Sequence, residues 1–318
     1  MRSVENRQSN SINKLLFDNA RLFFSVTTNL GWKIMGERLK NELSALNSSG
    51  KHGFRAFTLS NKWSPFAWSA NYSESERVLF PILDPHVAFW LASSAVRREA
   101  QQYDVIVAAT APLASAFLVG KRHPYVFQFV DGTRDIFRRD FGIDNISDAA
   151  IERERKHFHQ VQHTFALSNW VKRNIVDVYG VPANRVTVVP PLAQSVMEKI
   201  PRRKRNKRLQ IAFVGGDFIR KGGQNLIAWQ RQSLHKFADL HVVTDPRWND
   251  SSVPATRWYG HLSNAKIVDE LLPSVDVLCH PTTRDCSAIV VAEAAALGVP
   301  SVASSVGGIP EALLHNPP

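Results

Sequence analysis

The sequence predicts an α/β protein of two domains, each built around a parallel β-sheet covered by helices. The chain has 318 residues, and at about 100–200 residues per domain this length suits two domains. Hydrophobic residues make up 44% of the chain and charged residues 21%, a globular composition with enough apolar side chains for two cores. Short apolar runs alternate with segments of helical periodicity, which is the pattern of consecutive βαβ units.

The first domain is predicted to span residues 1–195. After a polar arm, the apolar run at 21–28 predicts a buried strand that Gly31 closes. Apolar residues from Trp32 to Leu46 then recur at helical spacing, and a second strand is expected at 52–59. The same alternation predicts strands at 103–109, 125–130, 164–167 and 185–189, and helices at 110–119, 152–162 and 170–179.

Residues 196–208 are predicted to be a linker, and residues 209–318 a second α/β domain. Its first strand, at 209–214, leads through a glycine turn and a basic loop into a helix at 223–233. Ligands of open α/β sheets bind beyond the carboxyl ends of the strands, so polar motifs at those ends are the candidate site. The remaining pattern predicts strands at 240–244, 257–259, 275–280 and 300–304, and helices at 267–272 and 288–297.

Cysteine usage and hydropathy predict a cytoplasmic protein. The chain contains two cysteines, Cys279 and Cys286, too few for a disulfide framework and at the wrong spacing for a zinc site. The polar N-terminal segment lacks the apolar core of a secretory signal. The longest apolar stretch, 105–120, contains Pro112 and is shorter than the roughly 20 residues that a membrane span requires.

The charge balance predicts phosphate-bearing partners. The net charge is +11 and the isoelectric point is near 9.9, so the surface attracts nucleotides, anionic lipid headgroups or nucleic acid. Six cations fall within residues 202–208. That run is compatible with a solvated linker, with contact to an anionic membrane at its inner face, or with nucleic-acid binding. Because no aromatic residues interleave with it and no nucleic-acid-binding module is present, we expect no nucleic-acid partner.

The segment from Phe213 to Gly223 predicts a diphosphate site. A strand runs into Gly215 and Gly216, and Arg220 and Lys221 follow just before two glycines that open a helix. Glycines allow close backbone approach, helix N-termini favour anions, and arginine and lysine bind phosphate oxygens. The spacing matches neither a Walker loop nor GxGxxG. A glycine-rich turn with two solvated cations remains the alternative.

The segment 280–304 places two carboxylates around the start of a helix. Asp285 lies just before the first turn, Ser287 is a candidate N-cap, and Glu293 lies two turns later among apolar residues. A carboxylate in so apolar a helix needs a partner. The two hydroxyls of a ribose suit Glu293, because an ionised carboxylate only accepts hydrogen bonds. In the alternative, Asp285 only caps the helix and Glu293 pairs with a nearby cation.

Residues 164–311 resemble the retaining GT-B glycosyltransferases of group 1, or family 4, which include mannosyl-, glucosyl- and N-acetylglucosaminyltransferases. The resemblance rests on the glycine turn with its Arg/Lys pair, and on Asp285 and Glu293 at the spacing of a Glu-x7-Glu motif. The segments 166–181 and 307–311 match as well. It implies two Rossmann-like domains facing a cleft and a hexosyltransferase without metal or other cofactor. Such an enzyme moves a sugar from a nucleoside diphosphate to a glycan or lipid-linked glycan hydroxyl with retained configuration.

The resemblance also implies roles for particular residues. Arg220 and Lys221 would neutralise the donor diphosphate, Asp285 would face the sugar, and Glu293 would bind the ribose. Gly31 stands where the family has a glycine turn on the acceptor side. Asp131 would orient a hydroxyl, or would serve as a helix cap. The donor site would be completed by Gly215, Gly216 and the helix that starts near Ser287.

Three departures from the family keep a second interpretation open. Asp285 replaces a glutamate, the segment 286–288 replaces a Gly-aromatic-Gly sequence, and the chain ends at Pro318, soon after the 307–311 segment. The alternative is therefore a catalytically inactive or truncated protein that binds nucleotides on the same architecture.

Overall fold

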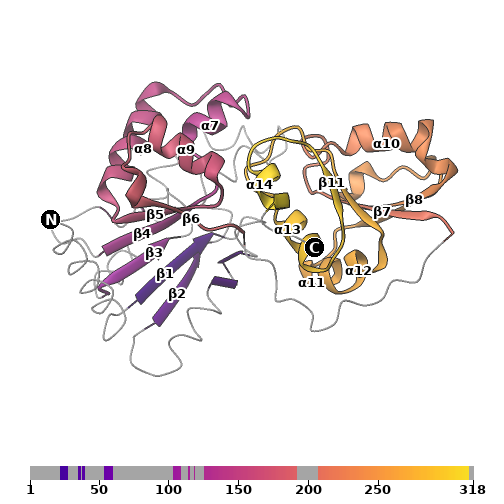
Figure 1. Ribbon diagram of the computed structural model, residues 1–318, viewed down its shortest axis with the longest axis horizontal. Coiled ribbons are helices and arrows are strands. Elements are labelled where there is room, and N and C mark those ends of the chain that lie inside the picture. Colours follow the sequence, from indigo (N-terminus) through magenta and orange to yellow (C-terminus); the bar gives the residue numbers. More distant parts are fainter. Residues whose placement is uncertain are drawn as a thin grey trace. The chain divides into compact units, whose positions relative to one another are not determined.

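The structure is a computed structural model. It contains two compact units (Figure 1), each described here by itself. Most of the chain up to Val188 forms the first unit, and Val189–Pro318 forms the second together with the short segments Arg139–Gly142 and Leu167–Val171. The residues that the structure describes are 22–27, 35–36, 38–39, 54–59, 103–108, 114, 118, 125–191 and 207–314.

The first unit contains a six-stranded parallel sheet in the order β2-β1-β3-β4-β5-β6. The chain moves outward from β1 to β2 and then in the opposite direction from β3 onward, so the strand order reverses between β1 and β3. Helices α7, α8 and α9 lie together on one side of β4–β6 (Figure 1). The elements are β1 Leu22–Thr27, β2 Phe54–Leu59, β3 Val105–Ala108, β4 Tyr125–Val130, α7 Arg134–Arg139, α8 Asp148–Gln160, β5 His163–Ala166, α9 Asn169–Asp177, η3 Ala183–Arg185 and β6 Val186–Val188.

The second unit contains a five-stranded parallel sheet in the order β11-β10-β7-β8-β9. Its strand order reverses between β7 and β10, which are neighbours in the sheet. The elements are β7 Leu209–Val214, α10 Gly223–Gln232, η4 Leu234–Lys236, β8 Ala238–Val243, η5 Pro246–Trp248, β9 Thr256–Gly260, α11 Asn264–Lys266, η6 Ile267–Leu271, α12 Leu272–Ser274, β10 Val277–His280, α13 Ile289–Ala296, β11 Ser301–Ala303 and α14 Ile309–Leu314.

Helices cover both faces of this second sheet. Leu226 of α10 packs with Phe213 and Leu240 in one buried cluster. Val291 of α13 packs with Leu278 of β10 in a separate cluster on the other face. Strands buried on both faces explain the continuous apolar runs in the sequence. The predicted α/β class with two parallel, Rossmann-like sheets is confirmed.

Local sequence chemistry explains where the predicted elements differ from those observed. Helix α8 begins at Asp148, four residues before the predicted start, because the Ser147 hydroxyl caps it by accepting the N–H of Ala150 (3.2 Å). Helix α7 was not predicted, since Ile136 is its one buried residue and gives no periodicity. Of the helices predicted at 32–46 and 110–119, the structure describes only residues 35–36 and 38–39 of the first and 114 and 118 of the second; residues 35–36, 38–39 and 114 are helical. Most of the linker predicted at 196–208 lies outside the described residues.

A buried acid in α8 is hydrogen-bonded to the turn after α9 and to the start of α7 in the first unit. The Tyr179 hydroxyl donates to Glu154 Oε2 (2.5 Å), and the Arg134 N–H donates to the same oxygen (2.8 Å). Burial raises the pKa of Glu154 to about 7, although these hydrogen bonds oppose the rise. The neighbouring His157 is also buried, and burial lowers its pKa to about 3.

We expect Glu154→Gln to change how the free energy of unfolding depends on pH. A carboxyl with a raised pKa stabilises the fold fully below its unfolded value of 4.5, and this contribution is lost as the pH rises through about 7. The shift corresponds to about 3 kcal/mol. His157 acts in the opposite direction, so the informative quantity is the difference between variant and parent in urea unfolding from pH 4 to 8. Parallel pH profiles for the two proteins would show that folding does not raise the pKa of Glu154, and would contradict this prediction.

Candidate active site

The candidate site lies where the strand order of the second sheet reverses. Strands β7 and β10 pair in parallel, with Ile211 opposite Val277 and Ala212 opposite Leu278. Their carboxyl ends therefore lie side by side, and each leads into one of the two polar motifs. The loop after β7 carries Arg220 and Lys221, and the loop after β10 carries Asp285. Such a reversal is where open α/β sheets bind ligands.

Three of the predicted site residues meet in one cluster. Lys221 Nζ donates to Asp285 Oδ2, and Arg220 Nη1 lies 4.0 Å from Asp285 Oδ1. The side chains of Lys221 and Asp285 are 17% and 8% exposed, and that of Arg220 is 29% exposed. In the alternative interpretation, Arg220 and Lys221 were two solvated cations on a glycine-rich turn. The structure instead holds both side chains, mostly buried, around one carboxylate. A second anion reaching this point would meet two cations already held in place.

The two loops are joined through Arg220. Its carbonyl accepts the backbone N–H of Thr283 (2.8 Å) and the Thr283 hydroxyl (3.0 Å). Its guanidinium donates from Nε to Asp217 Oδ2 (2.9 Å) and from Nη1 to the carbonyl of Arg284 (2.8 Å). The ring of Phe141 lies 5.9 Å from the guanidinium carbon. These contacts fix the direction of the guanidinium, so little conformational entropy remains to be lost when an anion binds.

His280, which the sequence analysis did not single out, completes the cluster. It ends β10, is fully buried, and its Nε2 lies 3.0 Å from Asp285 Oδ2. Burial lowers the pKa of His280, and Lys221 lowers it further. The imidazole is therefore neutral, and Nε2–H donates to the carboxylate. Its Nδ1 has no hydrogen-bond partner among the described residues.

Asp285 is consequently held as a buried carboxylate. Burial by itself would raise its pKa, but the attraction of Lys221 and the hydrogen bond from His280 hold the pKa far below the usual value of 3.8. Its carboxylate is thus occupied by Lys221 and His280 and does not cap the following helix. The sequence signal that could have revealed His280 was its place at the end of a strand, five residues before Asp285.

The predicted N-cap at Ser287 is wrong. Helix α13 begins at Ile289, and its N-cap position is Ala288, with no side-chain hydrogen bond to the helix N-terminus. The loop backbone remains extended through Ala288, with φ −89° and ψ 94°. This places Ser287 one residue too early to reach the first free N–H groups, because capping requires the residue directly before the helix.

Glu293, Gly215 and Gly216 are the remaining predicted site residues of the second unit. Glu293 is 3% exposed within α13, and the amide of Asn264 donates to its Oε1 (3.0 Å). One partner of Glu293 is thus a neutral amide. The N–H of Gly215 donates to the carbonyl of Val243 (3.0 Å), so it serves the sheet, and Gly216 is exposed next to it.

Glu311, the last residue of the 307–311 segment, caps another helix. It accepts the N–H groups of Asn169 (2.5 Å) and Trp170 (2.8 Å), and also the side-chain amide of Asn169 (2.9 Å). A carboxylate at the N-terminus of α9 satisfies free N–H groups and complements the helix dipole. This part of the motif is therefore structural, and it ties α14 to the first residues of α9, which lie in the segment Leu167–Val171 of the second unit.

The two acceptor-side predictions fall in the first unit. Asp131 follows β4 directly and is half-buried. Two residues further on, the Thr133 hydroxyl accepts the N–H of Ile136 (3.2 Å) at the start of α7. Gly31 lies outside the described residues.

Within the described part of the chain, no three His, Cys, Asp or Glu side chains are grouped so as to hold a metal ion. The helices described here are also too short or too polar to cross a membrane.

The two parallel sheets and the paired cations at a strand-order reversal define a two-unit α/β protein with a candidate anion-binding site in its second unit. Two family models match the chain. Residues 44–192 match Glycosyltransferase Family 4, and residues 194–317 match Glycosyl transferases group 1. The two models together cover most of the chain, which is a GT-B glycosyltransferase of the group 1, or family 4, type. No curated protein sequence matches it.

Solved structures share the fold at low sequence identity. WaaG, a glycosyltransferase involved in lipopolysaccharide biosynthesis, has a TM-score of 0.65 at 16% identity, over 92% of this chain and 84% of its own. Sucrose-phosphate synthase from Thermosynechococcus elongatus has a TM-score of 0.67 at 13% identity, over 91% and 82%. Anabaena HepE, solved in complex with UDP and glucose, has a TM-score of 0.60 at 12% identity, over 92% and 83%.

Proposed function

We propose that this glycosyltransferase moves a hexose from a nucleoside-diphosphate sugar to an acceptor hydroxyl, with retention of configuration. The observation that carries the proposal is the convergence of Arg220, Lys221 and Asp285 at the reversal between β7 and β10. A diphosphate there would take Lys221 from its ion pair and would meet the fixed guanidinium of Arg220. HepE, which shares the fold, binds UDP and glucose, and this supports a donor of the same chemical class.

The two cations supply the electrostatic part of catalysis. When the bond between the anomeric carbon and the phosphate oxygen breaks, its electron pair moves onto the departing diphosphate. Fixed positive charge at that position stabilises the transition state, and a group of this kind contributes about 3–4 kcal/mol. The acceptor oxygen forms the new bond on the same face of the sugar, and its proton passes to the departing phosphate oxygen. No separate base is needed.

The neighbouring carboxylates select the donor. Once a diphosphate occupies Lys221, Asp285 keeps the hydrogen bond from His280 and can accept hydroxyls of the transferred sugar. Glu293 is proposed to accept the ribose hydroxyls. Asp131 and Gly31 are assigned to the acceptor side, and the acceptor is a glycan or lipid-linked glycan. The scheme uses no metal or other cofactor and no nucleic acid.

Contact with an anionic membrane surface, the further partner in this proposal, would rest on the cations between 202 and 207. Arg208, the last cation of the basic run, is already engaged. Its guanidinium donates to Asp239 Oδ1 (2.8 Å) and to the carbonyls of His235 and Ala238 (both 2.7 Å). Sedimentation with anionic vesicles at low salt tests this contact. A protein that remains in the supernatant would remove the membrane from the proposal.

Calorimetric titration of the chain with UDP, GDP and ADP, and then with their sugar conjugates, tests the donor site. We expect one diphosphate to bind with a dissociation constant on the order of micromolar. Incubating its sugar conjugate with glycan acceptors, and reading the anomeric configuration of the product by NMR, tests transfer and retention. Binding without transfer to any acceptor would instead identify an inactive nucleotide-binding protein. No binding by the folded chain would contradict both functions.

His280→Ala is expected to move the acid limb of the pH–rate profile to higher pH. Removing the Nε2–H donor withdraws a hydrogen bond from the ionised form of Asp285, so the pKa of Asp285 rises and the carboxylate is protonated at a higher pH. His280→Gln keeps an N–H donor and should restore most of the parent profile. An unchanged acid limb in His280→Ala would mean that Asp285 does not need this donor.

A further inference from the structure

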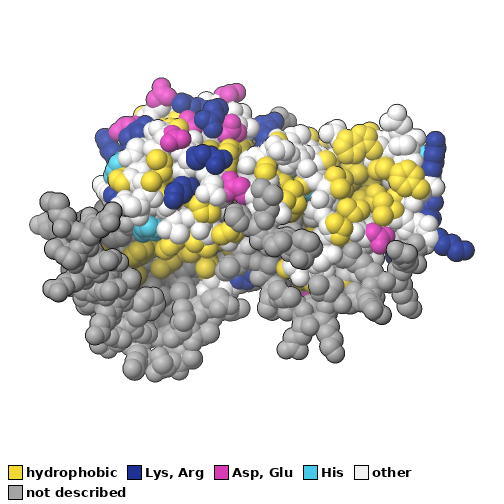
Figure 2. All heavy atoms as spheres, in the orientation of Figure 1, with side chains coloured by type: hydrophobic (Ala, Val, Ile, Leu, Met, Phe, Trp, Pro, Cys, Tyr) yellow, Lys and Arg dark blue, Asp and Glu magenta, His cyan; other side chains and the backbone are white. Residues whose placement is uncertain are grey.

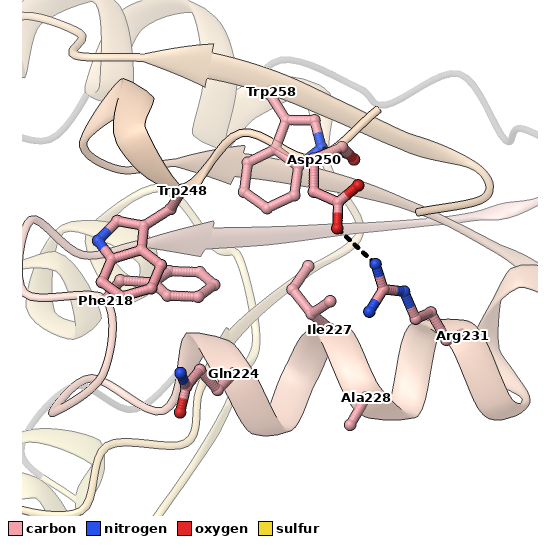
Figure 3. A pocket seen from close by; sticks show the side chains of 8 residues that line it. All are labelled: Phe218, Gln224, Ile227, Ala228, Arg231, Trp248, Asp250 and Trp258. Carbon is pink, nitrogen blue, oxygen red and sulfur yellow. Dashed lines mark hydrogen bonds and ion pairs between the residues drawn. The ribbon is translucent and has the colours of Figure 1, made fainter. Parts of the chain in front are cut away.

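A pocket lies on the α10 side of the second unit, apart from the Lys221–Asp285 cluster. Its volume is about 310 Å³ (Figure 3). One wall is α10, with Ile227 and Ala228, and the opposite side is formed by Trp248 and Trp258. Hydrophobic side chains also gather on the surface over this part of the unit (Figure 2). The volume is at the lower end of the roughly 300–1,000 Å³ of small-molecule sites.

Three aromatic rings in the pocket are held in fixed orientations. The rings of Phe218 and Trp248 are stacked, with centroids 5.0 Å apart and planes 25° apart. Trp258 lies 6.3 Å from Phe218 at a tilt of 48°, and its Nε1–H donates to the carbonyl of Asp250 (3.0 Å). Phe218 is buried, whereas both tryptophans are partly exposed. Phe218 stacks on Trp248 and the Arg247 guanidinium also lies over that ring, so the pocket offers a ligand the exposed part of the Trp258 indole and the remaining exposed edge of Trp248.

Polar groups surround these rings at the rim. Arg231 donates to Asp250 Oδ2 and to the hydroxyl of Ser252 (3.1 Å), so its guanidinium is fixed while the side chain stays exposed. Gln224, in the first turn of α10, is exposed and makes no side-chain hydrogen bond to another described residue. A ligand lying on the rings would thus meet an amide, a guanidinium and a carboxylate around its edge.

We propose that this pocket is a saccharide-binding site for one or two pyranose rings. A pyranose has an apolar C–H face that can lie on an indole and a rim of hydroxyls that both donate and accept, which matches the apolar centre and polar edge of the pocket. A free anion fits less well, because Arg231 is neutralised by Asp250 and the guanidinium of Arg247 lies over Trp248 at 5.9 Å. An acyl chain would bring its apolar surface against that ion pair.

The pocket adjoins the phosphate-site loop from the opposite side. Phe218 belongs to the same loop as Arg220 and Lys221, and its carbonyl accepts the N–H of Gly223 at the start of α10 (2.8 Å). The side chain of Phe218 faces Phe213 and Trp248, whereas that of Lys221 faces Asp285. The saccharide site is thus separate from the site of transfer, and its occupancy does not depend on the proposed reaction.

Fluorine NMR of the full chain labelled with 5-fluorotryptophan tests the site directly. The chain has eight tryptophans, and Trp248→Phe and Trp258→Phe assign the two resonances of interest. Methyl glucoside, methyl galactoside, N-acetylglucosamine and maltose are titrated into the parent chain without nucleotide, where the resonances of Trp248 and Trp258 report this pocket. We expect at least one saccharide to shift both resonances saturably.

Ala228→Arg, which fills the pocket from an exposed helical position, should weaken this binding at least tenfold. Asn225→Arg is the matched control, because Asn225 is exposed on the same helix and does not line the pocket; it should leave binding unchanged. Saccharides that shift neither resonance would overturn the proposal, and so would equal binding by the two arginine variants. Adenosine and uridine are titrated in the same way. If they shift the two tryptophan resonances and no saccharide does, the pocket is a nucleobase site and the proposal is overturned.

Discussion

Replacing Lys221 with alanine is expected to lower turnover by about 10²–10³-fold, because the variant loses one of two fixed charges at the departing phosphate. The affinity for the nucleoside diphosphate should fall as well. Steady-state kinetics with the donor identified by calorimetry measures the first effect, and the same titration measures the second. Lys266→Ala removes an exposed lysine of the same unit and should leave both quantities unchanged.

Lys221→Ala is also expected to lower the free energy of unfolding, so its effect on turnover must be distinguished from its effect on folding. Lys221 pairs with a carboxylate that is 8% exposed, and removing one partner of such a pair costs about 3–5 kcal/mol. The double variant Lys221→Ala/Asp285→Asn leaves no unpaired charge and should recover most of that stability in urea unfolding without recovering turnover. Parent-like turnover in a folded Lys221→Ala protein would show that Lys221 is not part of the donor site.

Replacing Gly222 with alanine should destabilise the second unit strongly. Gly222 has φ +79°, and a Cβ there would lie 1.9 Å from the carbonyl oxygen of Pro281. The left-handed backbone costs a non-glycine residue about 1–2 kcal/mol, and the overlap adds about 1–3 kcal/mol. Because Pro281 begins the loop that carries Asp285, separating the two loops should also weaken diphosphate binding.

Gly180→Ala is the matched control for this experiment. Gly180 has φ +69°, and no atom lies within 4 Å of the position its Cβ would take. This variant should therefore lose only the conformational contribution, about 1–2 kcal/mol, and should bind the diphosphate normally. Equal losses in the free energy of unfolding for the two variants would show that Gly222 and Pro281 are not in close contact in solution.

The sequence by itself determined the class of fold and the principal elements of the second unit. The strand at 209–214 was predicted with its observed bounds, and the helix at 223–233 with an error of one residue. Both follow from local features, an apolar run closed by glycines and a helical period behind them. The placement of Arg220, Lys221 and Asp285 at strand ends followed from the same pattern, because parallel strands present their carboxyl ends at one edge.

Only the tertiary structure decided which side chains bind one another. Lys221 and Asp285 are 64 residues apart, and their contact depends on β7 and β10 being neighbours in the sheet, which no local pattern specifies. The same holds for Glu311, which reaches Asn169 across 142 residues, and for the aromatic pocket, whose rings come from three separate elements. Packing also placed the start of α13 after Ser287. Sequence periodicity shows which side of a single segment is buried. Contacts between distant residues depend on which segments become neighbours in the folded sheet, and this is not encoded in any one segment.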